Sequence, residues 1–298
     1  MRSMTRRSPI FSSACPGFPC WRAKGGARLS LGGAQGKLPV VLADGRIAVP
    51  RVGEPSTYLI KPEPERFAGL AANEAFCLAL ARAAGLDAAT GQWQAVAGKP
   101  YLLVARYDRV ERNGQIQRLH QEDIAQALGV PSNRKYASEG GPNFRDCFAL
   151  VRQATTRPAR EVLKLADAAI FNLIIGNAAA HAKNFSLLRR EDGEVVLAPL
   201  YDLVATFIWP ELSAGLAMRF GPAASLEEVD GDSLIGFEQD SGLTLLFLRR
   251  RAAALAGQVE AAIARGIQVP GLADRALTGE LSQAIADRAG RLVLKARG

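Results

Sequence analysis

Residues 174–188 read IIGNAAAHAKNFSLL, and this stretch decides how the rest of the chain is interpreted. An apolar run ends here, a polar cluster containing His181 and Asn184 follows, and a short apolar segment resumes. Polar side chains at a helix-to-strand turn are typical of a catalytic loop, because rigid elements position loops that carry function. The carbonyl oxygen of Asn184 suits Mg²⁺. For His181, a lone histidine, a structural hydrogen-bonding role is the commoner one.

A carboxylate follows soon afterwards in the sequence PLYD (199–202). Residues 195–198 predict a short strand, and the residue that follows such a strand would reach the same cleft as Asn184. There Asp202 could hold Mg²⁺ through its carboxylate. The alternative is that Asp202 only caps the next helix.

Two charged residues earlier in the chain fit the same chemistry. Residues 57–61 (TYLIK) predict a strand that ends on Lys61, and the predicted helix at 70–84 contains Glu74. A strand lysine paired with a helical glutamate holds the α- and β-phosphates of ATP in protein kinases. Taken singly, a surface lysine and a solvated glutamate are the more ordinary interpretation.

A glycine-rich stretch, SLGGAQ (30–35), precedes the first predicted hairpin. Glycine lets backbone N–H groups approach phosphate oxygens closely, although a simple turn is the commoner use of Gly-Gly. The order of the parts carries more information than any one of them. A glycine-rich loop, a strand lysine, a helical glutamate, a loop asparagine and an aspartate after a strand follow one another as in kinases.

One part of that order is missing. In kinases the catalytic aspartate lies five positions before the metal-binding asparagine, and here that position is Ala179. No other acid occurs between Asp167 and Glu191. The carboxylate that would accept the proton of a substrate hydroxyl is therefore absent.

The predicted elements indicate an α+β fold with two lobes and a cleft between them. We expect a basic arm (1–28), a β-rich N-lobe (29–110) and a helical C-lobe (111–298). The expected strands are 38–43, 46–49, 57–61, 93–97, 101–107, 184–188 and 195–198. The expected helices are 70–84, 121–128, 144–153, 158–175, 243–265 and 278–295.

Composition excludes several protein classes. Hydrophobic residues make up 48% and charged residues 22% of the 298 residues, which is typical of a globular protein. No run of 18 apolar residues predicts a membrane span, and we expect a cytoplasmic protein. The first 28 residues hold six of the 37 basic residues and no acid, so most of the net charge of +8 belongs to the arm. A nucleic-acid-binding surface is thus disfavoured.

The four cysteines are too few for a disulfide framework. Cys77 and Cys147 lie in apolar helical patterns and are expected to be buried thiols. Cys15 and Cys20 could supply half of a zinc site, but no second Cys or His pair at ligand spacing follows them.

Taken together, the segments resemble the HipA-like kinases, the toxin components of bacterial toxin–antitoxin systems. The resemblance covers about 29–290 and rests on LSLGGAQGKL (29–38), YLIKP (58–62), NEAFCLALARAAGL (73–86), ARYDR (105–109), LHQEDIAQALG (119–129), KYASEGGP (135–142), IIGNAAAHAKNFSLL (174–188) and LAPLYDLVAT (197–206). It implies a bilobed, protein-kinase-like fold. It also implies ATP- and Mg²⁺-dependent serine/threonine phosphorylation of a translation component, typically an aminoacyl-tRNA synthetase.

The resemblance also implies a role for individual residues. The implied metal ligands are Asn184 and Asp202. The implied nucleotide-binding set is Lys61, Glu74, the hinge Ala105, Arg106 and Tyr107, and His181. Ser30 corresponds to the loop serine that these kinases autophosphorylate, and Gly32, Gly33 and Gln35 shape that movable loop. The implied partner is a helix-turn-helix antitoxin, through which operator DNA would be contacted only indirectly.

Two departures from the family pattern matter. The catalytic loop of the family reads GNxDxHxKN, whereas this chain has Ala179 at the aspartate. Either the aspartate of a kinase toxin was replaced, or the chain is a natural pseudokinase or nucleotide-binding scaffold; retention of Lys61, Asn184 and Asp202 favours replacement. Only 29 residues precede Ser30, so the chain resembles the short, HipT-like form. A separate small protein resembling the missing N-terminal subdomain is then expected as a further partner. Target choice is expected in surface loops such as 209–232.

Overall fold

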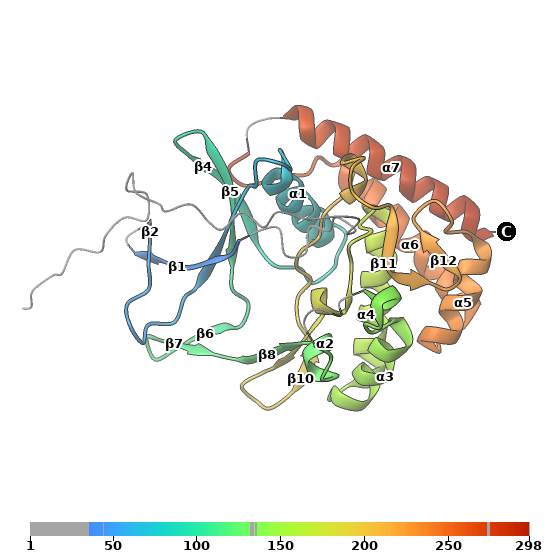
Figure 1. The fold of residues 1–298 in the computed structure, drawn as a ribbon, viewed down its shortest axis with the longest axis horizontal. Helices are drawn as coiled ribbons and strands as arrows, with labels where there is room; N and C mark the ends of the chain where they lie inside the picture. Colours follow the sequence, from blue (N-terminus) through green and yellow to red (C-terminus); the bar gives the residue numbers. More distant parts are fainter. Residues whose placement is uncertain (1–35, 44, 132–133, 135, 273–274, 298) are drawn as a thin grey trace, which may run out of the picture.

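The computed structural model shows an α+β protein with two lobes, as the sequence predicts (Figure 1). It describes residues 36–297 except 44, 132–133, 135 and 273–274. The first lobe is built on a five-stranded antiparallel sheet with the order β2-β1-β3-β5-β4. The second lobe is mainly helical, and helices α6 (Leu245–Ala264) and α7 (Arg275–Arg297) run along its outside (Figure 1).

The sheet begins with the predicted hairpin. Strands β1 (Leu38–Ala43) and β2 (Arg46–Ala48) pair around Gly45. The φ of Gly45 is 73°, in the left-handed region that glycine adopts without a steric penalty. Strand β3 (Tyr58–Pro62) lies between β1 and β5 (Lys99–Ala105), and β4 (Gly91–Val96) forms the far edge. Lys61 therefore lies on a central strand, opposite Leu102 of β5.

Helix α1 (Leu70–Ala83) is the contact between the two lobes. All residues from Leu70 to Ala81 are buried, because the helix packs against β4 and β5 on one side and against α6 and α7 on the other. A helix enclosed on all sides does not need an amphipathic pattern. The charged Glu74 and the polar Asn73 are buried with it.

A second sheet joins the helical lobe and has the order β10-β9-β8. It consists of β8 (His120–Asp123), β9 (Ser186–Arg189) and β10 (Val195–Leu197). The prediction of a helix from Gln121 is wrong at its start, because 120–123 pair with β9 and Asp123 instead caps the short helix α2 (Ile124–Ala127). The preceding hairpin, β6 (Arg109–Arg112) and β7 (Gln115–Arg118), was not predicted, since its strands are almost entirely polar.

Helices α3, α4, α6 and α7 lie close to their predicted positions, whereas α5 (Gly231–Ser241) was not predicted. Helix α3 (Phe144–Ala154) begins at an Asn143 capping box, and α4 (Pro158–Ile174) begins with proline in its first turn. Three short 3-10 helices complete the described chain: η1 (Ala137–Glu139), η2 (Ala182–Asn184) and η3 (Thr206–Ile208).

Residues 209–232 are not the surface loop that the sequence suggested. Trp209 is buried with its ring edge-on to Phe67 at 5.9 Å. The hairpin β11 (Gly215–Phe220) and β12 (Ala223–Ser225) follows, and helix α5 (Gly231–Ser241) starts within the segment. Phe220 of this hairpin stacks on Phe237 of α5 with ring centroids 4.1 Å apart. Burial of these aromatic rings orders the segment.

No helix of the described chain is both long and apolar enough to cross a membrane. Cys77 and Cys147 are buried free thiols, as predicted. Burial raises the pKa of Cys77 to about 12, so this thiol is an unreactive part of the core. Cys15, Cys20 and the whole basic arm lie outside the described residues.

We predict that Phe237→Ala destabilises the helical lobe by about 3–5 kcal/mol. Phe237 is fully buried and contacts the rings of Phe144, Phe148 and Phe220. Urea unfolding at equilibrium measures the change, and Ile235→Ala on the same helix, 40% exposed, is the matched control. A loss no larger than that of the control would mean that the aromatic cluster does not hold α5 in place.

Candidate functional site

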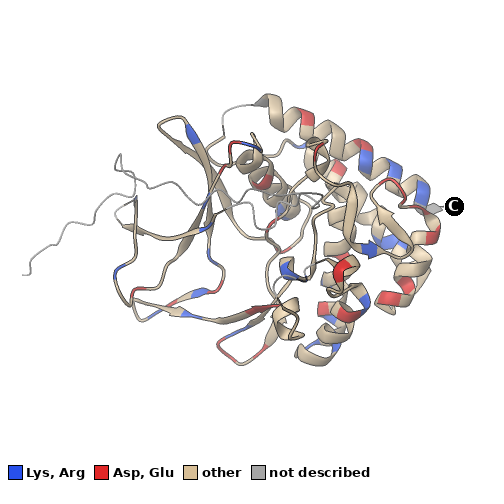
Figure 2. Cartoon of the chain, in the orientation of Figure 1, with Lys and Arg blue, Asp and Glu red and all other residues tan. Residues whose placement is uncertain are grey.

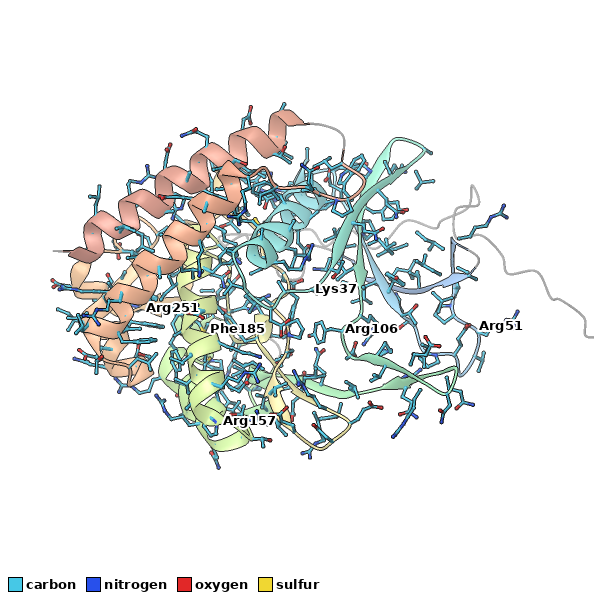
Figure 3. The ribbon with its side chains drawn as sticks, turned by 180° about the vertical axis from the view of Figure 1, so that it is seen from behind. Lys37, Arg51, Arg106, Arg157, Phe185 and Arg251 are labelled. Atoms are coloured by element: carbon cyan, nitrogen blue, oxygen red, sulfur yellow. The ribbon has the colours of Figure 1, made fainter. Side chains whose placement is uncertain are left out.

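The site is centred on Lys61, which bridges the two lobes. Its ammonium group forms ion pairs with Glu74 of α1 and with Asp202, which follows β10. Lys61 and Glu74 are almost fully buried, whereas the side chain of Asp202 remains 26% exposed. Lys37, half-exposed at the start of the sheet lobe, also contacts Asp202, at 3.2 Å. Figure 3 shows Lys37 between the sheet and the helical lobe.

The opposite charges of this cluster stabilise the ionised forms of Lys61 and Asp202. Burial alone would lower the pKa of Lys61, but Asp202 and Glu74 outweigh it and hold that pKa above its usual value. Burial would raise the pKa of Asp202, but Lys61 and Lys37 hold it well below its ordinary range. Burial raises the pKa of Glu74 in spite of its pairing with Lys61. Asp202 is thus a carboxylate at neutral pH and Lys61 an ammonium.

Asn184 lies beside this cluster. It ends the 3-10 helix η2, where its side-chain oxygen accepts the backbone N–H of His181 at 3.0 Å. Its amide nitrogen donates to Oδ2 of Asp202 at 3.2 Å. The loop therefore brings together the two residues that the sequence predicted as metal ligands.

The position of Asp202 is set by its backbone. Asp202 has a φ of 53°, which is rare for a residue with a side chain and favours residues such as aspartate. Just before it, Leu200 exchanges backbone hydrogen bonds with Asp87 and Ala89, at 2.8 Å each. The carbonyl oxygen of Asp202 accepts from the amide of Asn177 at 3.4 Å. The carboxylate consequently points toward Lys61.

Asn73, next to Glu74 on α1, fixes the helix to the segment that follows Asp202. Its amide nitrogen donates to the carbonyl oxygen of Ala205 at 3.1 Å, and its oxygen accepts the N–H of Ala205 at 2.8 Å. Both partners are buried. The sequence analysis missed this role; the available signal was a polar residue within an otherwise apolar helix.

Ala179 lies in the loop that Asn177 orders. The backbone N–H of Ala179 donates to Oδ1 of Asn177 at 3.2 Å, and the amide of Asn177 donates to Asn172 at 2.8 Å. Ala179 is half-buried. The methyl group at this position has no lone pair and can accept no proton.

The predicted hinge follows the end of β5. The N–H groups of Ala105 and Arg106 donate to the carbonyl oxygens of Thr90 and Thr57, both at 2.9 Å. The Arg106 guanidinium pairs with Asp108, and Figure 3 shows Arg106 beside the sheet lobe. The ring of Tyr107 stacks on that of Tyr201 with centroids 6.1 Å apart. Tyr107 thus connects the hinge to the segment that contains Asp202.

His181 is buried and lies edge-on to the ring of Tyr136 at 6.1 Å. This packing agrees with a structural role. Ser30, Gly32, Gly33 and Gln35, which the sequence places in the glycine-rich loop, lie outside the described residues. Lys37 was not among the predicted site residues, because a single lysine at the start of a strand gives no distinctive signal.

The donor set around Asp202 fits Mg²⁺ with a nucleotide. Asp202 and Asn184 offer the oxygen ligands that Mg²⁺ prefers, and substrate phosphates usually complete such a site. Lys37 and Lys61 both pair with the carboxylate of Asp202, so a positive charge is stabilised beside this carboxylate. Among the described residues no group of three or more His, Cys, Asp or Glu side chains could hold a metal ion by itself.

Comparison with known proteins identifies the family. A family model described as HipA-like C-terminal domain matches residues 29–267. A putative kinase, Y4mE of Sinorhizobium fredii, is 48% identical over 256 residues, covering 86% of this chain and 61% of that protein. The serine/threonine-protein kinase toxin HipA of Shewanella oneidensis is 28% identical over 82% of this chain and 58% of its own.

Comparison with solved structures finds the same fold. A structure of HipA, HipB and operator DNA from Shewanella oneidensis matches with a TM-score of 0.84 and 25% identity, over 94% of this chain and 68% of that one. The kinase CtkA of Helicobacter pylori shares the fold at a TM-score of 0.52 and 14% identity. The chain belongs to the HipA-like C-terminal domain family. It spans between 52% and 63% of the length of the curated relatives described by these comparisons.

We predict that Asn73→Ala destabilises the protein, because it leaves the N–H and C=O of Ala205 buried without their partner. Each unsatisfied group costs about 1–3 kcal/mol. Urea unfolding measures the loss. The control is Gln283→Ala, which removes an amide that bonds Asp287 on the exposed side of α7. Equal stability of the two variants would contradict the proposed clamp between α1 and residue 205.

The lowered pKa of Asp202 predicts a pH dependence. Its ion pairs stabilise the fold above the unfolded pKa of about 3.9 and are lost as the pH falls through the folded value. The stability difference between the wild type and Asp202→Asn should thus be constant near neutrality and shrink below about pH 4. Unfolding midpoints measured from pH 7 to 3 test this, and a pH-independent difference would refute it.

Proposed function

We propose that this member of the HipA-like C-terminal domain family is the core of an ATP-dependent serine/threonine protein kinase that acts as a toxin. The observation that carries the proposal is the buried Lys61, which is shared by Glu74 and Asp202 at the cleft, with Asn184 in contact with Asp202. This set unites the phosphate-binding and metal-binding groups of a kinase. The activity named for the relatives in these comparisons supports it.

Each residue has a defined task in this proposal. Lys61 donates to the α- and β-phosphates of ATP, and Glu74 holds its ammonium in place. Asn184 and Asp202 hold Mg²⁺, which would neutralise charge on the phosphate oxygens. Ala105, Arg106 and Tyr107 face the adenine. His181 supports the loop through its packing.

Because residue 179 is alanine, we expect nucleotide binding to be retained and phosphate transfer to be impaired. The groups that bind Mg·ATP are present, but the base that would accept the proton of the substrate hydroxyl is not. Losing a general base typically costs about 10²–10⁴ in rate. We propose that this chain binds Mg·ATP and transfers little phosphate. The alternative that Ala179 leaves open is a pseudokinase scaffold that holds nucleotide only structurally.

A solved structure of a relative supports an antitoxin partner, while the proposed target rests on the family resemblance alone. The structure matched at a TM-score of 0.84 contains HipA with HipB and operator DNA. We propose that this chain binds a helix-turn-helix antitoxin and a small separate protein, and that it contacts operator DNA only through the antitoxin. The proposed substrate is a translation component, an aminoacyl-tRNA synthetase, and Ser30 is the proposed autophosphorylation site.

Restoring the base tests the proposal. Ala179→Asp should raise phosphate transfer from Mg·ATP by about 10²–10⁴ while the affinity for nucleotide changes little. Incubation with Mg·ATP and a bacterial lysate, followed by mass spectrometry, should find phosphate on Ser30 and on a component of the translation machinery. Calorimetric titration with a non-hydrolysable ATP analogue measures binding separately.

The controls are Lys61→Met and Asp202→Asn in the Ala179→Asp background, which should lose both binding and transfer. Nucleotide binding without any transfer by Ala179→Asp would contradict the kinase and support the scaffold. Failure of the wild type to bind Mg·ATP would refute both functions.

A further inference from the structure

A cavity of about 370 Å³ lies on the helical lobe, outside the nucleotide cleft. It is bounded by the C-terminal half of α7 and by the segment that leads from β12 to α5. Its lining residues are Leu173, Leu226, Glu227, Val229, Arg288, Arg291, Leu292 and Lys295. Figure 2 shows basic positions along this half of α7. The function proposed above makes no use of this cavity.

The cavity is rich in positive charge. Arg288, Arg291 and Lys295 are three and four residues apart and therefore share one face of α7. Glu227, which is exposed, is the one acid in the lining. In the described part of the chain, no carboxylate lies within 4.0 Å of any of the three cations. Lys295 donates instead to the backbone carbonyls of Glu227 and Val229, at 3.1 and 2.7 Å. The nearby Asp230 has its pKa lowered by hydrogen bonds from Ser233 and, to a smaller extent, by the charge of Lys295.

Arg288 is the unusual member of this group. Its Nη2 donates to the carbonyl oxygen of Leu173 at 3.3 Å, and its guanidinium lies over the ring of Phe207 at 5.3 Å. Its Nε is buried and has no hydrogen-bond partner among the described residues. Burial lowers the pKa of Arg288, as does Arg291, and only Glu227 opposes them. A buried donor without an acceptor is costly, and such groups call for a specific explanation.

We infer that this cavity binds a phosphate-type oxyanion. Planar guanidinium groups match phosphate oxygens in pairs, and a lysine adds a mobile charge. An anion between Arg288, Arg291 and Lys295 would compensate the unpaired charges of all three. The ligand class is a phosphate group, either as free inorganic phosphate or as a small phosphomonoester. This inference is independent of the kinase proposal.

The position of Arg288 connects the cavity to the catalytic loop. Gly176, which opens that loop, has a φ of 67°, and a Cβ on it would lie 2.9 Å from Nε of Arg288. Phe207, under the guanidinium, belongs to η3, which follows Asp202. Arg288 therefore lies between the cavity and the two segments that contain Gly176 and Phe207.

Titration of the full chain with inorganic phosphate, against chloride of equal ionic strength, tests the inference. Calorimetry gives the affinity and a thermal melt gives the stabilisation. Arg291→Gln and Lys295→Gln change exposed residues that should not disturb folding, and together they should weaken phosphate binding at least about tenfold. Arg288→Gln should do the same. Arg250→Gln, an exposed arginine on α6 with the same loss of charge, is the matched control and should leave binding unchanged.

Phosphate could also enter the nucleotide cleft, so each titration is repeated in Lys61→Met. Binding that disappears in Lys61→Met but survives in the double variant of α7 would overturn the inference, as would equal stabilisation by chloride. Hydrogen exchange supplies a local readout: phosphate should protect 226–229 and Gly176 in the wild type and not in Arg288→Gln. O-Phosphoserine in place of phosphate separates the two sources, since tighter binding of the monoester identifies it as the natural ligand.

Discussion

The structure depends on the burial of one ammonium group between two carboxylates from different parts of the chain. Lys61 is brought by the sheet, Glu74 by α1 and Asp202 by the segment after β10. A buried cation is costly unless it is paired, and here both pairs are needed because each carboxylate is itself partly or fully buried. Formation of this cluster therefore requires the sheet, the helix and the helical lobe to meet at one point.

Hydrogen bonds around the cluster hold α1 in the position at which Glu74 pairs with Lys61. Asn73 fixes α1 to Ala205 with two hydrogen bonds, and Leu200 is paired with the chain that leaves α1. In protein kinases the pairing of lysine with the helical glutamate depends on the position of that helix, which activation controls. Here α1 is enclosed by both lobes, so its movement would break buried contacts on either side.

The helices and strands that could be predicted are those whose hydrophobic pattern or capping residues agree with their secondary structure. Strands β1–β5 alternate or are apolar, and α3, α4 and α6 carry clear caps or long apolar patterns, so their positions could be predicted from local physics. The hairpin β6–β7 and strand β8 could not, because their residues are polar and only pairing with β9 makes 120–123 extended. The meeting of Lys61, Glu74, Asn184 and Asp202 could be anticipated from their order. Lys37 acts through a tertiary contact that leaves no local signal, and the only sign of the role of Asn73 was a polar residue within a mainly apolar helix.

The catalytic loop shows why a missing base need not disturb the fold. Its conformation is set by Asn177, which bonds Asn172, the N–H of Ala179 and the carbonyl of Asp202, and by Asn184, which bonds the N–H of His181. These bonds use the backbone of residue 179 and not its side chain. The side chain at 179 is therefore free to vary while Lys61, Asn184 and Asp202 keep their places. The loop presents a preformed position at which a single carboxylate would supply the proton acceptor that the remaining site lacks.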